Sequence, residues 1–372
     1  MVPKWVVSGI LAFGVALPAM AGPTGLTPLQ QLGKEIFMDP TLSEPAGQAC
    51  MACHSPNTGF TSPSSERNGK EAIVEGAFSG RNGNRTPPSV AYASFSPKLS
   101  WNAKDKTYFG GQFRDGRSVD LVDQAKGPFL NPVEMNNPSG ESVCRKVNAS
   151  SYGELIATVY GGPLDCEAAG FEQVVKAIAA YETSTEVNAF SSKYDAYLKK
   201  RVQLTAQEMR GMKLYQGQAK CDQCHPSKPG PHGEAPLFTD FTYDNIGAPR
   251  NLENPFYAQS VDINPNGAAY VDSGLGATVK KQRELGKFKV PTLRNIAAGG
   301  TGFVRAYLHN GSIKGLKEVM EFYNRRDVVP NKWQPEEPLN VNRKELGNLK
   351  LTSAQEDDVI AFMQTLTDGW KE

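Results

Sequence analysis

The sequence predicts a mainly α-helical protein made of two similar halves, with long irregular loops. Three observations indicate this fold class: a CxxCH motif that occurs twice, matched helical segments around each motif, and connecting stretches rich in Gly, Pro and Asn. Strand patterns are few, and 372 residues suffice for about two domains. We place the domains at residues 22–190 and 191–372.

The first 21 residues are typical of a secretory signal. Lys4 precedes an apolar run from Trp5 to Leu17, and small residues follow, so we expect cleavage near Ala21 and export to the periplasm. The alternative is a membrane anchor, but a span needs about 20 apolar residues and this run is shorter. We expect no membrane span. Because 40 Lys+Arg balance 39 Asp+Glu, we expect no nucleic-acid partner.

Each half is predicted to open with a helix. "LTPLQQLGKEIF" (26–37) aligns with "LTAQEMRGMKLY" (204–215), and apolar residues recur with helical period in both. Thr27 and Thr205 are suited to cap the two helices. Gly33 of the first segment coincides with Gly211 of the second, and Phe37 coincides with Tyr215.

Each half is also predicted to close with a helix. "FEQVVKAIAAYETS" (171–184) and "SAQEDDVIAFMQTL" (353–366) both have a helical apolar pattern. Their cores, "AIAAYET" and "VIAFMQT", align without a gap. Each half therefore reads as helix, motif, variable loops and closing helix.

The motifs are Cys50-Met-Ala-Cys53-His54 and Cys221-Asp-Gln-Cys224-His225. CxxCH is the attachment signature of c-type haem, in which the thiols bond the haem and the histidine ligates its iron. A thioredoxin-type pair or half a zinc site is the alternative for one copy, although only His232 is near enough to add a zinc ligand. Two copies in an exported chain favour two covalently bound haem c groups.

Two cysteines, Cys144 and Cys166, lie outside the motifs. In an oxidising compartment such a pair usually forms a disulfide. The closed loop would stabilise the fold by roughly 3 kcal/mol in the chain-entropy model. Two free structural thiols are the alternative.

The residues that could ligate the first haem iron on the side opposite His54 are found by elimination. No histidine lies between His54 and His225. Met51 is inside the motif turn on the proximal side, whereas Met135 is a distal ligand that the sequence leaves open. We expect a five-coordinate first haem that can bind a small molecule. The alternative is a six-coordinate electron-transfer haem.

Four stretches resemble the bacterial dihaem cytochrome c peroxidase family, and especially its MauG-like branch. They are "GGQFRDGRSVDLVDQAKGPFLNPVEM" (110–135), "FTDFTYDNIGAP" (238–249), "FKVPTLRNIA" (288–297) and "YLHNGSIKGLKEVMEFYNRRD" (307–327). The resemblance implies two tandem cytochrome c-like domains, each with one haem. The N-terminal haem would react with hydrogen peroxide, and the C-terminal haem would exchange electrons with a periplasmic protein, as donor or substrate.

The resemblance also implies the ligand of the second haem. Alignment on Leu316-Lys317-Glu318 puts Tyr323 where typical peroxidases have a methionine, as in the MauG-like branch. A phenolate is a harder donor than a thioether and would stabilise ferric iron. Met320, one helical turn earlier, and His309 are the rivals.

The same resemblance also implies which residues act on peroxide at the first haem. Gln124 and Glu134 match a family pair that orients peroxide and moves its proton, and Pro128 lies between them. Read alone, this stretch would be a helix end followed by an exposed acid. The loop 68–89 lacks the histidine that caps the peroxide haem in typical peroxidases, so we expect reactivity without prior reduction.

Two departures from the family pattern bear on function. Arg114 stands where the family usually has a tryptophan between the haems, so electron transfer must be direct or use another residue such as Trp101. Arg114 could instead bind a haem propionate. Thr86 replaces an asparagine of the family's calcium site, so calcium is possible but unsupported.

The combined expectation is a periplasmic haem peroxidase that oxidises a protein partner. One alternative is a conventional cytochrome c peroxidase that detoxifies peroxide with electrons from a small cytochrome or cupredoxin. An alternative of another class is a non-catalytic dihaem electron-transfer cytochrome. The residues indicate no oligomeric state.

Overall fold

The computed structural model of the chain describes residues 25–230 and 233–372. The export signal and His232 lie outside these residues. The α-helices are α1 (Pro28–Met38), α2 (Cys50–Cys53), α3 (Ser65–Gly69), α4 (Leu121–Leu130), α5 (Gly140–Asn148), α6 (Gly153–Tyr160), α7 (Gly170–Glu182), α8 (Lys193–Leu198), α9 (Ala206–Gln216), α10 (Leu275–Val279), α11 (Leu316–Arg325) and α12 (Ser353–Gln364).

The prediction of a mainly helical chain is confirmed. Only four short strands occur among the described residues: β1 (Ser100–Asn102), β2 (Thr107–Phe109), β3 (Tyr243–Asp244) and β4 (Phe288–Lys289). They form two antiparallel pairs, β1 with β2 and β3 with β4. In the part of the chain that is described, no helix combines the length and the apolar character needed to cross a membrane.

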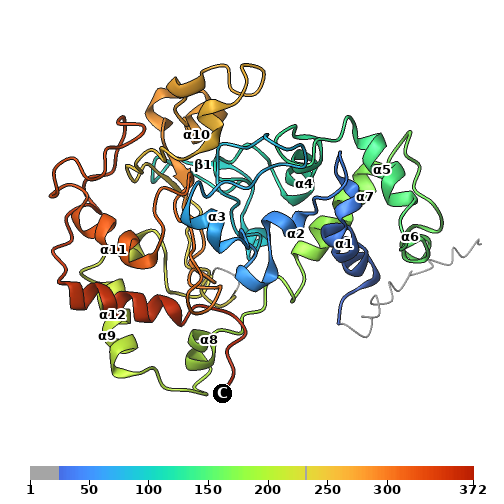
Figure 1. The fold of residues 1–372 in the computed structure, drawn as a ribbon. Coiled ribbons are helices and arrows are strands. Elements are labelled where there is room, and N and C mark those ends of the chain that lie inside the picture. Colours follow the sequence, from blue (N-terminus) through green and yellow to red (C-terminus); the bar gives the residue numbers. More distant parts are fainter. Residues whose placement is uncertain (1–24, 231–232) are drawn as a thin grey trace, which may run out of the picture.

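The helices gather into two groups. Figure 1 shows α1, α4, α5, α6 and α7 on one side and α9, α11 and α12 on the other, with long loops between them. One buried apolar cluster takes all its members except Leu237 from residues 26–187. Two further clusters use only residues from 194 onward.

The opening helices begin where the sequence predicts. The Thr27 hydroxyl accepts a hydrogen bond from the Gln30 amide at 3.3 Å, and the Gln30 side chain accepts one from the Thr27 amide at 3.0 Å. Thr205 and Glu208 form the same reciprocal capping box at α9. These bonds satisfy amides that have no partner inside the helix.

The matched glycines let each opening helix touch its closing helix backbone to backbone. A Cβ on Gly33 of α1 would lie 1.8 Å from the carbonyl oxygen of Ala177 in α7. A Cβ on Gly211 of α9 would lie 1.9 Å from the carbonyl oxygen of Asp358 in α12. Ala177 and Asp358 therefore occupy equivalent positions. The gap-free alignment of the closing helices pairs Ala177 with Val359 instead, so it is wrong by one residue.

Aromatic packing explains the one-residue difference. The Phe37 ring meets the Tyr181 ring edge to face, with centroids 5.5 Å apart. The Tyr215 ring meets the Phe362 ring in the same way at 5.1 Å. Tyr181 and Phe362 are thus equivalent in space, since each packs on the aromatic residue that follows the glycine by one helical turn.

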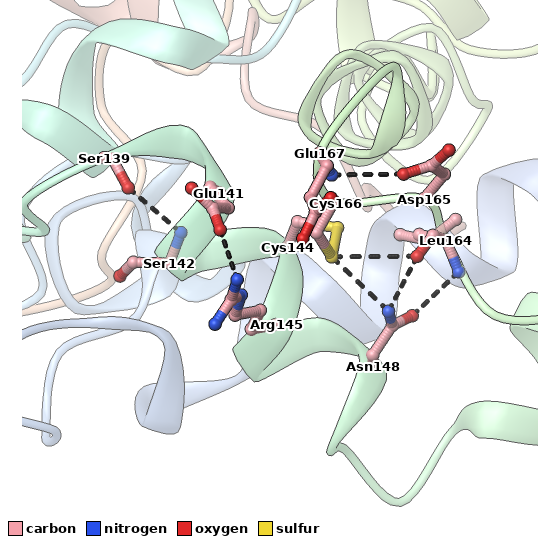
Figure 2. The surroundings of a disulfide bond; sticks show 10 residues. All are labelled: Ser139, Glu141, Ser142, Cys144, Arg145, Asn148, Leu164, Asp165, Cys166 and Glu167. Atoms are coloured by element: carbon pink, nitrogen blue, oxygen red, sulfur yellow. Dashed lines mark hydrogen bonds and ion pairs between the residues drawn. A yellow bond between two sulfur atoms is a disulfide. The ribbon is translucent and has the colours of Figure 1, made fainter.

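The predicted disulfide between Cys144 and Cys166 is confirmed (Figure 2). It joins α5 to the loop that precedes α7. The Asn148 side chain holds the same loop, because its amide nitrogen donates to the Leu164 carbonyl at 2.9 Å and its oxygen accepts from the Leu164 amide at 2.9 Å. This end of α5 is thereby fixed to the helix that packs on α1.

We predict that Gly33→Ala and Gly211→Ala each lower the free energy of unfolding by about 1–3 kcal/mol, because the new methyl group overlaps a backbone carbonyl. Gly153→Ala in α6 is the matched control, since its methyl group would meet nothing within 4 Å. The control should be neutral or stabilising by about 0.4–1 kcal/mol. Guanidinium unfolding of the haem-loaded protein measures all three, and equal stability of the three variants would refute the close-contact explanation.

Candidate functional site

One cavity, of about 470 Å³, is lined by residues of both halves and receives both CxxCH segments. His54 and His225 line it together with Cys50, Cys53, Cys221 and Cys224. The volume is in the range of cofactor and small-molecule sites. The structure thus brings together the six residues that the sequence predicts for haem attachment.

Short helical turns present the two histidines. His54 directly follows α2, and its backbone amide donates to the Cys50 carbonyl at 2.9 Å. His225 follows the 3₁₀ turn Cys221–Gln223, and its amide donates to the Cys221 carbonyl at 2.9 Å. Each turn therefore places two thiols and an imidazole along one wall of the cavity.

A backbone carbonyl orients each imidazole. His54 Nδ1 lies 3.2 Å from the carbonyl oxygen of Phe60, and His225 Nδ1 lies 2.8 Å from that of Phe238. Both phenylalanines adopt left-handed backbone conformations, with φ of 57° and 54°. Burial lowers the pKa of both histidines to about 4, so the rings are neutral at pH 7. With Nδ1–H donated to the carbonyl, Nε2 is the nitrogen that can bind a metal.

The four motif cysteines are free thiols that are half-buried. Burial raises the pKa of Cys53, Cys221 and Cys224 to about 12. Their thiols are thus protonated at neutral pH and are not paired with one another. This donor set fits covalent attachment of haem at each motif.

Glu134, Gln124 and Pro128 all line the cavity. Gln124 and Pro128 belong to α4, and the turn after α4 returns the chain so that the Met135 amide donates to the Pro128 carbonyl at 3.0 Å. Glu134 Oε1 accepts a hydrogen bond from Asn131 Nδ2 at 2.7 Å. Glu134 is therefore held inward, in contrast to the exposed acid that the stretch indicates when read alone.

Burial raises the pKa of the Glu134 carboxyl, opposed by the Asn131 hydrogen bond and by the positive charge of Arg117. The negative charge of Glu134 also raises the pKa of Cys53, which places Glu134 in the first half of the cavity. Met135 lines this part as well and belongs to the apolar cluster, whereas Met51 is 38% exposed.

In the second half, Tyr323 faces the cavity. It lies on α11, and its pKa is raised by burial and then by the nearby Cys224 and Cys221 thiols. Met320 is 3% exposed and packs in an apolar cluster without lining the cavity. The two residues are one helical turn apart and contact the same apolar cluster, but of the two only Tyr323 lines the cavity.

His309 also lines the cavity. Its ring stacks on Phe288 at 3.8 Å, and its Nε2 lies 3.6 Å from Glu336 Oε2 without a hydrogen bond. Its ring lies within electrostatic range of Asp272, to which Arg85 Nε donates at 2.6 Å. His309 therefore belongs to a buried polar group with these residues.

Positive charge gathers along the cavity wall. Arg114, Lys289 and Arg305 line the cavity, and none forms an ion pair within the described residues. Burial lowers the pKa of Arg114 to about 10 and that of Lys289 to about 8. Buried cations without anionic partners are costly. The propionate carboxylates of two haems are anions that would compensate them, so the residues present fit the cofactor.

The two positions that depart from the family pattern, Arg114 and Thr86, are hydrogen-bonded to each other. Arg114 Nη2 donates to Thr86 Oγ1 at 2.8 Å, and Thr86 Oγ1 donates to the Leu308 carbonyl at 3.1 Å. A guanidinium therefore occupies the neighbourhood of Thr86, and calcium is not supported there. Trp101 lies on β1, is 38% exposed and does not line the cavity, so it is not placed between the motifs.

Sequence reasoning missed several cavity residues. Lys289 and Arg305 converge with Arg114 from distant segments, and no local pattern marks them. Glu182, at the end of α7, also lines the cavity, and burial raises its pKa to about 8. The Phe60 carbonyl could have been found only from the left-handed conformation that the tertiary fold imposes.

Comparisons with known proteins show what the chain is similar to. The di-haem cytochrome c peroxidase family profile matches residues 28–203. The methylamine utilization protein MauG of Paracoccus denitrificans is 35% identical over 358 residues, which cover 91% of this chain and 88% of that protein. The cytochrome c551 peroxidase of Nitrosomonas europaea is 26% identical, over 91% of this chain and 80% of that protein.

A solved structure shares the fold. The diheme peroxidase BthA from Burkholderia thailandensis superposes with a TM-score of 0.77 and 32% identity, over 95% of this chain and 88% of that one. The chain belongs to the di-haem cytochrome c peroxidase family and is a haem-dependent oxidoreductase of the peroxidase type.

Proposed function

We propose that this chain is a periplasmic MauG-like peroxidase with two unequal haem c sites. The domains at residues 22–190 and 191–372 would each resemble a cytochrome c and attach one haem, through Cys50 and Cys53 or through Cys221 and Cys224. The division of the buried apolar clusters near residue 190 supports this organisation. His54 and His225 would be the proximal ligands.

The single observation that carries the proposal is the position of Tyr323. It faces the cavity beside Cys221 and Cys224, while Met320 is enclosed in the apolar cluster. Burial raises the pKa of the Tyr323 phenol, and the positive charge of Arg326 opposes this only in part. A ferric iron would supply the charge that stabilises its phenolate. We infer that Tyr323 closes the second site, whereas the first site stays open opposite His54.

A haem held at the first motif would supply the iron and the electrons for cleavage of the peroxide O–O bond. The chain supplies the proton transfer. The Glu134 carboxylate would accept the proton from the inner peroxide oxygen and return it to the outer oxygen, which then leaves as water. The Gln124 amide lines the same part of the cavity and would orient the peroxide. Asn131 keeps the Glu134 carboxylate in position.

The electrons would come from a periplasmic protein, through the second site. Arg114 cannot carry an oxidised state as an indole can, so transfer past it would be direct. Its guanidinium is anchored on Thr86 and lines the cavity, where it would bind a haem propionate.

We predict that Glu134→Gln slows the reaction with hydrogen peroxide by about 10²–10⁴-fold, because the amide cannot take up the proton. In the wild-type protein the rate should fall as the pH drops through the raised pKa of Glu134, above the ordinary value of 4.5, and the variant should lose this dependence. Stopped-flow absorbance measures both. Glu154→Gln, an exposed acid of α6, is the control and should react like the wild type.

We predict that Tyr323→Phe removes the low-spin absorption and EPR signals of the second haem. The midpoint potential of the second haem should rise by on the order of 100 mV, because an anionic oxygen no longer stabilises the ferric state. Met320→Leu is the control and should preserve the low-spin signals. If Met320→Leu removes them and Tyr323→Phe does not, the tyrosine ligand is wrong.

A further inference from the structure

A hairpin formed by β1 and β2 carries an aromatic pair, the exposed Trp101 and the half-buried Tyr108. Trp101 pairs with Tyr108 in the strand register, and their ring centroids are 4.9 Å apart. Trp101 is 38% exposed. Figure 1 places β1 beside α10, away from the ends of α6 and α12. Exposed tryptophan flanked by arginine is typical of the residues that contribute most to protein interfaces.

Exposed cations flank this pair along the hairpin and in the segment 280–283, which contacts its rings. They are Lys98, Lys104, Lys106, Lys280, Lys281 and Arg283. No ion pair holds the five lysines within the described residues, and Arg283 pairs with Glu284. Asp105 is the exposed acid of the hairpin turn. Because the whole chain is nearly neutral, at +1, this basic surface is a local concentration of charge. We call these six cations with Trp101 and Tyr108 the hairpin patch.

The cations also determine what Trp101 can do. Lys281 Nζ lies 5.7 Å from the Trp101 ring centroid, and the Arg283 guanidinium carbon lies 4.9 Å from it. Lys281 Nζ donates to Tyr108 Oη at 2.5 Å. Such contacts fix the rings. Neighbouring positive charges oppose removal of an electron from the indole, so Trp101 is suited to contact a partner and unsuited to carry an oxidised state.

The base of the hairpin is bonded to the cavity wall. The Gly110 amide donates to the Phe241 carbonyl at 2.9 Å, and Lys289 Nζ donates to the Gly111 carbonyl. Phe241 and Lys289 both line the cavity. A protein bound at the hairpin patch would thus lie over a wall of the cavity that receives both CxxCH motifs.

We propose that the hairpin patch docks an acidic redox protein that donates electrons to this enzyme. The inference rests on the proposed peroxidase function and names the charge of its partner. Each docked protein would give one electron, and two electrons with two protons reduce one hydrogen peroxide to two waters.

The test uses the haem-loaded enzyme with peroxide and two reduced proteins, an acidic cupredoxin and a basic mitochondrial cytochrome c. The wild type should oxidise the acidic protein faster, and this rate should fall as ionic strength rises. Lys98→Glu/Lys104→Glu/Lys106→Glu should lower it about tenfold at low ionic strength. The control Lys199→Glu/Arg201→Glu/Lys213→Glu reverses three exposed cations elsewhere and should change it less than about twofold. Trp101→Ala should lower the rate, and Trp101→Phe should largely preserve it.

A small uncharged electron donor tests the peroxidase function independently of docking. If the wild type fails to reduce peroxide with this donor, the peroxidase function itself is wrong. Provided that all variants keep that activity, either of two results would overturn docking at the hairpin patch. One is a faster reaction with the basic protein than with the acidic protein, and the other is an equal effect of the hairpin and control variants. Equal rates for Trp101→Ala and Trp101→Phe would show that the aromatic pair does not contribute to the interface.

Discussion

The contact between two helix backbones in each half is the constraint on which the remaining structure depends. Gly33 and Gly211 allow α1 to touch α7 and α9 to touch α12, where any side chain would meet a carbonyl oxygen. Each opening helix leads into a CxxCH segment, so this contact sets where the thiols and the imidazole enter the cavity. The shared arrangement extends to the imidazole, which a carbonyl of a left-handed phenylalanine orients in both halves.

The halves differ in the groups that line the cavity with each motif. In the first half the half-buried carboxyl of Glu134 and the amide of Gln124 line it, and such groups can move a proton and orient a small molecule. In the second half Tyr323 faces the cavity instead. Arg114, Lys289 and Arg305 add positive charge that has no ion-pair partner among the described residues, and two propionate-bearing cofactors would compensate it. We propose that the same framework supports a reactive site in one half and an electron-relaying site in the other.

Sequence patterns predicted the features that depend on local chemistry. The capping threonines, the helical periods, the CxxCH motifs and the Cys144–Cys166 disulfide all follow from short-range rules. Contacts between distant segments did not follow. Periodicity cannot distinguish Met320 from Tyr323, which are three residues apart on one helix, and no pattern connects Arg114 to Lys289. The register of α12 against α9 depended on aromatic packing that an ungapped alignment does not contain.

The central claim is that one haem site is open and the other is closed by a side-chain ligand. EPR of the oxidised protein, with both haems attached and no reductant added, tests it most directly. The account predicts one high-spin and one low-spin ferric signal of equal integrated intensity. Two low-spin signals without a high-spin component would contradict it, because the first site would then have no position for peroxide.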